Sequence, residues 1–175
     1  MRQIVLDTET TGISHASGHR IVELACIELV GRNKTGLHFH HYINPERECD
    51  LGALKVHGLS TQFLADKPKF VEIVDAFLEF VRGAELVIHN APFDMGFINS
   101  ELKLLGMPPL NSICASVCDT LPLARQKHPG KKNSLDALCV RYQVDNAHRD
   151  LHGALLDADL LAEVFLRMTN DSVAS

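Results

Sequence analysis

The 175-residue sequence lacks the segments that would place a protein in a membrane or direct it out of the cell. No apolar run approaches the roughly 20 residues that a transmembrane helix needs. The N-terminus has no charged segment followed by an apolar one, as a secretory signal would. Internal repeats, low-complexity tracts and interdomain linkers are also missing. These absences predict a single cytoplasmic domain over residues 1–169, followed by a short disordered tail at 170–175.

Cysteine motifs and excess positive charge are lacking as well. The five cysteines are odd in number and form no Cys-x-x-Cys pair, so reduced thiols are expected. A formal net charge of −5 argues against general attachment to nucleic acid, although a local basic strip can still bind it. The one such strip surrounds a Pro-Gly turn and by itself predicts a solvated loop. Its members are Arg125, Lys127, His128, Lys131 and Lys132.

The spacing of the apolar residues changes along the chain, from patterns typical of strands to patterns typical of helices. Apolar patterns indicate strands at 3–9, 21–30, 37–43, 85–89 and 113–117, and helices at 70–81, 92–106, 119–127, 134–142 and 154–168. The first three strands follow one another without a helix, which favours an antiparallel start. The later strands alternate with helices. The predicted fold class is therefore α/β, a mixed sheet flanked by helices.

The first strand ends in Asp7-Thr8-Glu9. Because side chains alternate along a strand, Asp7 and Glu9 are expected on the same face. Two carboxylates held this close raise each other's pKa unless positive charge lies between them. The pair alone allows either a metal site or an acid–base couple.

Asp94 and Asp157 are two further acids of interest, because each is followed by leucine, isoleucine or valine at the spacing of one face of a helix. A buried carboxylate without a partner is costly, so each needs a cation or a donor nearby. A single acid of this kind would be explained if it capped neighbouring backbone N–H groups or paired with an arginine. Two of them, together with Asp7 and Glu9, favour a metal site. Carboxylates without cysteine or histidine ligands suit Mg²⁺ or Mn²⁺ better than zinc.

A metal site for hydrolysis also needs a base, and His152 is the candidate. It precedes Asp157 by five residues, about 140° around a regular helix. Both residues can serve one site only if His152 lies in the loop before that helix. Gly153 is compatible with such a loop, and a mobile histidine is a suitable general base.

Three segments carry a family resemblance: Leu6–Gly12, His89–Asp94 and His152–Asp157. In this order they resemble the three motifs of the DEDDh, or DnaQ-like, superfamily of 3′→5′ exonucleases. Further similarity, through 56–59, 118–121 and 133–138, extends to the proofreading epsilon-type subunits of bacterial DNA polymerase III. The resemblance implies an RNase H-like fold with a mixed five-stranded sheet. It also implies hydrolysis of DNA to nucleoside 5′-monophosphates with two divalent cations, Mg²⁺ or Mn²⁺.

The resemblance also assigns roles to residues. Asp7, Glu9 and Asp157 would hold one cation, with Asp7 bridging to a second that Asp94 supports. His152 would take the proton from the attacking water. The residues expected to frame the terminal nucleotide are Thr8, Thr10, Thr11, Val56, His57, Asn90 and Phe93. The family often has an acidic substrate contact five residues before His57, where this chain has Gly52.

Single-stranded or frayed 3′ DNA ends are the implied substrate, with phosphate contacts expected from Lys131 or Lys132. The implied partners are a polymerase catalytic subunit and a sliding clamp, bound through C-terminal segments that this chain does not contain, and a small accessory subunit. The chain is accordingly expected to be a truncated catalytic domain or a short stand-alone relative.

Two alternatives remain at this point. One is an RNA-directed member of the superfamily, such as an oligoribonuclease or an RNase T-like enzyme. The other is a catalytically silent nucleic-acid-binding module, against which the presence of all five DEDDh residues argues. Among the other histidines, His38, His40 and His41 are expected on a partly exposed strand rather than in a metal cluster. A structural hydrogen bond is expected for His89.

Overall fold

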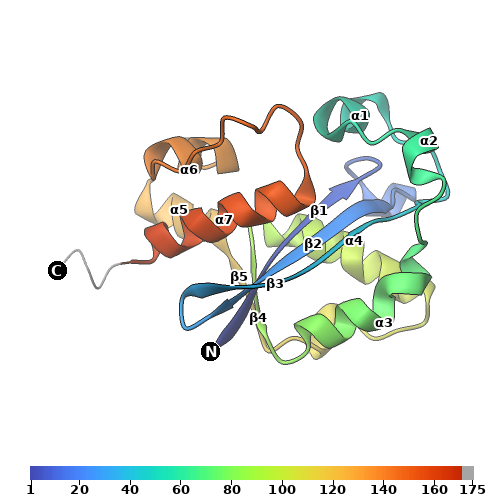
Figure 1. Ribbon diagram of the computed structural model, residues 1–175, viewed down its shortest axis with the longest axis horizontal. Coiled ribbons are helices and arrows are strands. Elements are labelled where there is room, and N and C mark those ends of the chain that lie inside the picture. Colours follow the sequence, from blue (N-terminus) through green and yellow to red (C-terminus); the bar gives the residue numbers. More distant parts are fainter. Residues whose placement is uncertain (171–175) are drawn as a thin grey trace.

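The computed structural model describes residues 1–170, which form a five-stranded sheet of order β3-β2-β1-β4-β5 (Figure 1). The strands are β1 (Arg2–Thr10), β2 (Ile21–Val30), β3 (Asn33–Tyr42), β4 (Glu85–Ile88) and β5 (Ser116–Asp119). β2 pairs antiparallel with both β1 and β3, whereas β4 runs parallel to β1 and β5. The mixed α/β sheet and its antiparallel start are therefore confirmed.

Helices cover both faces of this sheet (Figure 1). On one face, α3 (Phe70–Val81) and α4 (Ala91–Leu104) pack against Ile4 and Leu6 of β1. On the other, α7 (Ala154–Met168) packs against Val5. The helices α5 (Thr120–Lys127) and α6 (Leu135–Arg141) pack in turn against α7. Because side chains alternate along β1, Thr8 belongs to the α4 face, and Asp7 and Glu9 belong to the α7 face.

Two short helices lie beyond the carboxyl end of β1 and had no counterpart in the predicted elements. They are α1 (Leu51–His57) and α2 (Thr61–Leu64). The Asp50 N–H donates to the carbonyl of Thr11 at 2.8 Å and holds the start of α1 next to β1. Seven and four residues are too few to show a helical period, so the apolar pattern could not reveal them.

Two predicted strand boundaries are wrong. The third strand begins at Asn33 and not at residue 37, because Gly31 and Arg32 alone make the turn, with φ of 57° and 68°. Positive φ at both central residues is typical of a tight hairpin turn. The strand predicted at 113–117 begins at Ser116, since Leu110–Ser112 forms a 3₁₀ turn and the next residues pack into the core.

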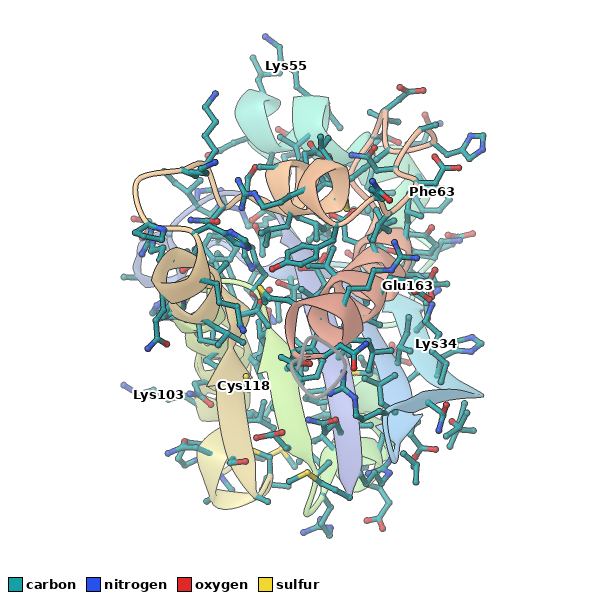
Figure 2. All side chains as sticks on the ribbon, turned by 90° about the vertical axis from the view of Figure 1, so that its left-hand side faces the viewer. Lys34, Lys55, Phe63, Lys103, Cys118 and Glu163 are labelled. Carbon is teal, nitrogen blue, oxygen red and sulfur yellow. The ribbon has the colours of Figure 1, made fainter. Side chains whose placement is uncertain are left out.

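The remaining sequence expectations concern the thiols and the chain end. All five cysteines are free thiols, as predicted. Cys114 is buried in the turn before β5, and Cys118 lies in β5 itself (Figure 2). Within residues 1–170, no helix is both long and apolar enough to cross a bilayer. Of the tail predicted to be disordered, residues 171–175 lie outside the described part of the chain.

Candidate active site

Three carboxylates meet between the end of β1 and the start of α7. Asp7 and Glu9 extend from the α7 face of β1, and Asp157 lies in the first turn of α7. One oxygen of each side chain lies within 4.8 Å of the other two. The structure thus brings together Asp7, Glu9 and Asp157 as oxygen donors of the kind that hard divalent cations prefer.

The proximity of these acids has a large electrostatic effect. Burial raises the pKa of Asp7 well above its usual value, and the negative charges of Asp94, Glu9 and Asp157 raise it further. Burial, followed by the charge of Asp157, raises the pKa of Glu9 to about 9. A cation between these groups would reverse both effects, because it favours the ionised carboxylates. The donor set therefore fits a divalent ion.

Asp94 approaches from the opposite face of the sheet. It lies in the first turn of α4, is 3% exposed, and accepts a hydrogen bond from the Thr8 hydroxyl at 2.5 Å. Burial is the largest cause of a rise in its pKa to about 7. Asp94 is outside the group of three converging oxygens, although its charge acts on Asp7. The structure gives it a place beside that group.

His152 lies in the loop immediately before α7, and its side chain lines the same cavity as the three carboxylates, about 330 Å³ in volume. Its backbone N–H donates to the carbonyl of Val56 at 2.8 Å, which ties this loop to α1. Its ring Nδ1 lies 3.3 Å from Nη2 of Arg149. The loop therefore places the imidazole ring of His152 beside the acids, although His152 lies outside the helix.

Arg149 had no place in the sequence prediction, yet it is the cation nearest to these acids in the described chain. Its Nε and Nη2 donate to the two oxygens of Asp157 at 2.6 and 2.9 Å, and its Nη1 lies 2.7 Å from Asp136 of α6. The hydrogen bonds and charges of these two carboxylates raise the pKa of Arg149, against the opposing effect of burial. A basic residue eight positions before Asp157 was the only signal in the sequence.

Glu23 is the second residue that the sequence did not reveal. It is paired with Glu9 in the β1–β2 register and is 2% exposed. One of its oxygens accepts the N–H of Ala154, the first residue of α7, at 2.8 Å, and the other lies 2.6 Å from Nε2 of His40. Glu23 thereby fixes the start of α7 on the sheet. His38 is exposed and His40 half-buried, which confirms the expectation of a partly exposed strand surface.

A second cavity, of about 370 Å³, lies on the other side of Glu9. Five of the residues expected around the terminal nucleotide line it: Thr8, Thr10, Val56, His57 and Phe93. Asn90 instead lines the cavity that holds the carboxylates. Thr11 lines neither cavity, because it is fully buried and its hydroxyl contacts the His19 ring and the Arg20 N–H.

His57 is held firmly in the wall of this second cavity. The Leu59 N–H donates to its Nδ1 at 3.0 Å, so the proton of the neutral ring belongs on Nε2. Nε2 donates to the carbonyl of Thr10 at 2.9 Å. Both ring nitrogens are therefore engaged with backbone, and the ring can offer a flat surface to a ligand.

The basic strip is anchored next to the end of β4. The His89 ring contacts the Thr120 hydroxyl and the carbonyl of Asn133, each at 2.8 Å, as expected of a structural hydrogen bond. The buried Asn133 amide donates to the carbonyls of His128 and Lys131. Together these contacts hold the loop that carries Lys131 and Lys132 beside Ser134 and Leu135, which line the carboxylate cavity.

The chain is similar to known exonucleases and to polymerase subunits in both sequence and structure. Residues 4–165 match the RNase_T family, described as exonuclease. The chain is 55% identical over 174 residues to the DNA polymerase III subunit epsilon of Escherichia coli (strain K12), covering 96% of this chain and 71% of that protein. It is 52% identical to the subunit of the same name from Rickettsia felis (strain ATCC VR-1525 / URRWXCal2), covering 97% and 74%. The solved structure of exonuclease X in complex with 5′ overhanging duplex DNA superimposes with a TM-score of 0.74 at 24% identity, covering 98% of this chain and 93% of that one.

Proposed function

Since the chain belongs to the exonuclease family, as a DnaQ-like DEDDh 3′→5′ exonuclease domain with an RNase H-like fold, we propose that it removes nucleotides from single-stranded or frayed 3′ ends of DNA and proofreads for a replicative polymerase. The observation that carries this proposal is the convergence of Asp7, Glu9 and Asp157 beside His152. The relatives named as polymerase subunits support the proofreading role.

The three converging carboxylates would hold a divalent cation, and Asp94 would support a second one next to Asp7. Mg²⁺ and Mn²⁺ are the ions of choice for an oxygen-only donor set. A pair of such ions would activate the attacking water and stabilise the leaving oxygen of the phosphodiester. The chain's own contribution is to keep four acids close together despite their repulsion, with Thr8 and Arg149 holding two of them.

We propose His152 as the general base that accepts the proton of the attacking water. Arginine can only donate, so Nδ1 of His152 is the acceptor in its contact with Arg149, and the neutral ring carries its proton on Nε2. That contact is long at 3.3 Å and beyond the usual range for a strong hydrogen bond. The lone pair of Nδ1 becomes available to the water when this contact opens.

The second cavity would receive the sugar and base of the terminal nucleotide. It adjoins the acids through Glu9 and offers the rings of His57 and Phe93 together with the apolar side chain of Val56. Gly52 also lines this cavity, and a Cβ built there would meet nothing within 4 Å. The backbone therefore leaves open space for a Cβ where the family often carries an acidic side chain, and this chain lacks the contact that such a side chain would make.

Proofreading needs no recognition of the wrong base. A mismatched end unpairs more readily than a matched one, so it reaches a single-strand site more often. The basic loop would then guide the strand through phosphate contacts from Lys131 or Lys132. Charge reversal at both positions should weaken single-strand binding and reduce its salt dependence. Unchanged affinity and an unchanged salt slope would show that this loop does not contact the strand.

The partners implied by the family remain part of the proposal. They are a polymerase catalytic subunit, a sliding clamp and a small accessory subunit, with action in the cytoplasm. The relatives named DNA polymerase III subunit epsilon support membership of a polymerase complex.

The decisive experiment measures release of nucleoside 5′-monophosphates from matched and 3′-mismatched primer–templates in Mg²⁺, in Mn²⁺ and in EDTA. We expect metal-dependent release that is faster at the mismatched end, and slower release from a matched RNA oligonucleotide. Loss of the base in His152→Ala should slow hydrolysis by about 10²–10⁴-fold, and Asp7→Ala should abolish it.

The matched control is Asp159→Asn, a change on the exposed side of the same helix, where Asp159 pairs with Lys34 at 2.6 Å. It should leave hydrolysis unchanged. Release that persists in EDTA, or full activity in either site variant, would contradict the proposed function.

A further inference from the structure

We propose that Arg149 is a positioning residue for the cation site, which fixes the carboxylate of Asp157 so that one of its oxygens joins those of Asp7 and Glu9. The inference rests on the proposed function, because it takes the three carboxylates to be cation ligands. Arg149 is not one of the five DEDDh residues, and its contacts with Asp157, Asp136 and His152 are the basis of the inference.

The geometry between Arg149 and Asp157 is that of a two-pronged pair. Nε reaches one oxygen at 2.6 Å and Nη2 reaches the other at 2.9 Å. The side chains are 8% and 6% exposed, so little solvent competes with the contact. Two parallel bonds to a planar guanidinium fix both the position and the rotation of a carboxylate. Each oxygen of Asp157 keeps acceptor capacity for another ligand, since a carboxylate offers about four acceptor sites.

Arg149 is itself held from the other side. Its Nη1 lies 2.7 Å from Asp136 in the first turn of α6, and Asp136 also accepts a bond from the Asn146 amide at 3.0 Å. The segment between α6 and α7 contains no helix or strand. The arginine side chain therefore links the first turns of two helices that also pack against each other, and α6 serves as its fixed support.

The same side chain also reaches the base. Nη2, which binds Asp157, lies 3.3 Å from Nδ1 of His152. The guanidinium of Arg149 thus contacts both a proposed cation ligand, Asp157, and the proposed base, His152. This arrangement couples the orientation of Asp157 to the resting position of the His152 ring.

Two physical effects of Arg149 on cation binding have opposite signs. Its positive charge repels a divalent ion, so charge alone predicts tighter binding when the arginine is removed. Its bonds orient Asp157 among acids that otherwise repel one another, so orientation predicts weaker binding. Partners that orient metal ligands typically change metal affinity by about 10–100-fold. We infer that orientation prevails, because both carboxylate oxygens are fixed and the contact is buried.

The test is the affinity of the DNA-free protein for Mn²⁺, measured by calorimetric titration after removal of metal with EDTA. Arg149→Met should weaken binding by about 10–100-fold. Arg149→Lys retains the charge and loses the two-pronged geometry, so it should fall between the wild type and Arg149→Met. Tighter binding by Arg149→Met, with Arg149→Lys equal to wild type, would show that only charge matters and would overturn the inference.

Two further variants complete the design. Asp136→Asn removes the support of Arg149 without touching Asp157, and it should weaken Mn²⁺ binding a few-fold. Arg32→Met is the control: Arg32 lies in the turn between β2 and β3 and contacts the C-terminal end of α7, where it donates to the Leu166 carbonyl at 2.6 Å and to Thr169 at 3.0 Å. It should leave Mn²⁺ affinity unchanged.

If Arg149→Met fails to fold, the lysine and Asp136→Asn variants still decide the question, and wild-type affinity in both would overturn it. A wild-type protein that binds no Mn²⁺ would overturn the proposed function together with this inference. Binding by the wild type and equal binding by all Arg149 variants would overturn this inference alone.

Discussion

Asp94 and Asp157 are buried to nearly the same degree, at 3% and 4% exposure, and both occupy the first turn of a helix. Their partners differ. Asp94 accepts from the neutral hydroxyl of Thr8, whereas Asp157 accepts two bonds from the guanidinium of Arg149. A charged donor stabilises a carboxylate about twice as strongly as a neutral one. Equal burial therefore leaves Asp94 with a pKa near 7, raised chiefly by burial, while Asp157 has a cation of its own.

The contrast originates in the alternation of β1. Thr8 faces α4, and its neighbours Asp7 and Glu9 face α7. The end of one strand thus meets acids from both sides of the sheet, one side through a hydroxyl and the other through carboxylates. The three carboxylates that converge directly, Asp7, Glu9 and Asp157, therefore lie on the α7 face of the sheet, and the supporting carboxylate, Asp94, lies on the α4 face.

The strongest test of this contrast is the pair Asp157→Asn and Asp94→Asn. Asp157→Asn should reduce hydrolysis by about 10³-fold or more, as the loss of a ligand in a site that acts as a unit does. It should also lower the free energy of unfolding by about 3 kcal/mol, since it breaks a buried ion pair and turns an amide NH₂ toward a guanidinium. Asp94→Asn should reduce hydrolysis but not the free energy of unfolding, because an amide oxygen can still accept from Thr8.

Urea unfolding in EDTA and rates of monophosphate release measure both effects. Asp159→Asn, in an exposed pair with Lys34, provides the control and should change the free energy of unfolding by less than about 1 kcal/mol. Equal loss of stability in Asp94→Asn and Asp157→Asn would remove the contrast.

The pH dependence of stability sharpens the comparison. The pKa of Asp94 in the folded protein, about 7, lies above its ordinary value of 3.8. Stability contributed by the protonated form is thus complete below about pH 4 and is lost as the pH rises toward 7. In EDTA, the wild type should lose roughly 2–4 kcal/mol relative to Asp94→Asn across this range. Glu9, with a pKa of about 9, should extend the loss to higher pH.

Urea unfolding of the two proteins at intervals between pH 4 and 8 measures this difference. Saturating Mg²⁺ should reduce it, since a cation favours the ionised acids. A difference in unfolding free energy that stays constant with pH would mean that Asp94 does not titrate in this range.

Much of this arrangement could be predicted from local patterns. The period of two in β1 placed Asp7 and Glu9 on one face, and the period of 3.6 placed Asp94 and Asp157 on core-facing stripes. The angular argument placed His152 before the helix, where the structure has it. Each of these statements needs only the neighbours of a residue along the chain.

Partners that meet across the fold could not be predicted in this way. Glu23 binds the first N–H of α7 from 131 positions away, and Thr8 binds Asp94 across 86 positions. Whether a buried acid receives a hydroxyl or a guanidinium depends on which strand face its helix covers. The short helix α1 was missed for a different reason, because its apolar pattern is too brief to show a period. The true start of β5 was missed because the apolar residues Ile113 and Cys114 pack into the core from the turn before the strand.

Removing the neutral donor tests the weaker side of the comparison. Thr8→Val keeps the shape of the side chain but leaves the buried oxygen of Asp94 without its 2.5 Å hydrogen bond. We expect a loss of about 1–2 kcal/mol in unfolding free energy, larger at pH 8 than at pH 5 because the ionised acid needs the donor more. Thr8→Ser retains the hydroxyl and should restore most of the stability. A loss that Thr8→Ser fails to restore would place the cost in packing instead.

The starts of the two helices offer the smallest and most local test. Asn90 precedes α4 with φ of 66°, a left-handed conformation, whereas Gly153 precedes α7 with φ of −116°, which any residue can adopt. Asn90→Ala should cost about 1 kcal/mol, because a Cβ is strained there and asparagine tolerates it better than alanine. Asn90→Gly should be close to neutral. Gly153→Ala should be neutral or stabilising by about 0.5 kcal/mol through the unfolded chain. Urea unfolding of the three variants measures the difference, and a cost at Gly153 equal to that at Asn90 would show that backbone conformation does not distinguish the two helix starts.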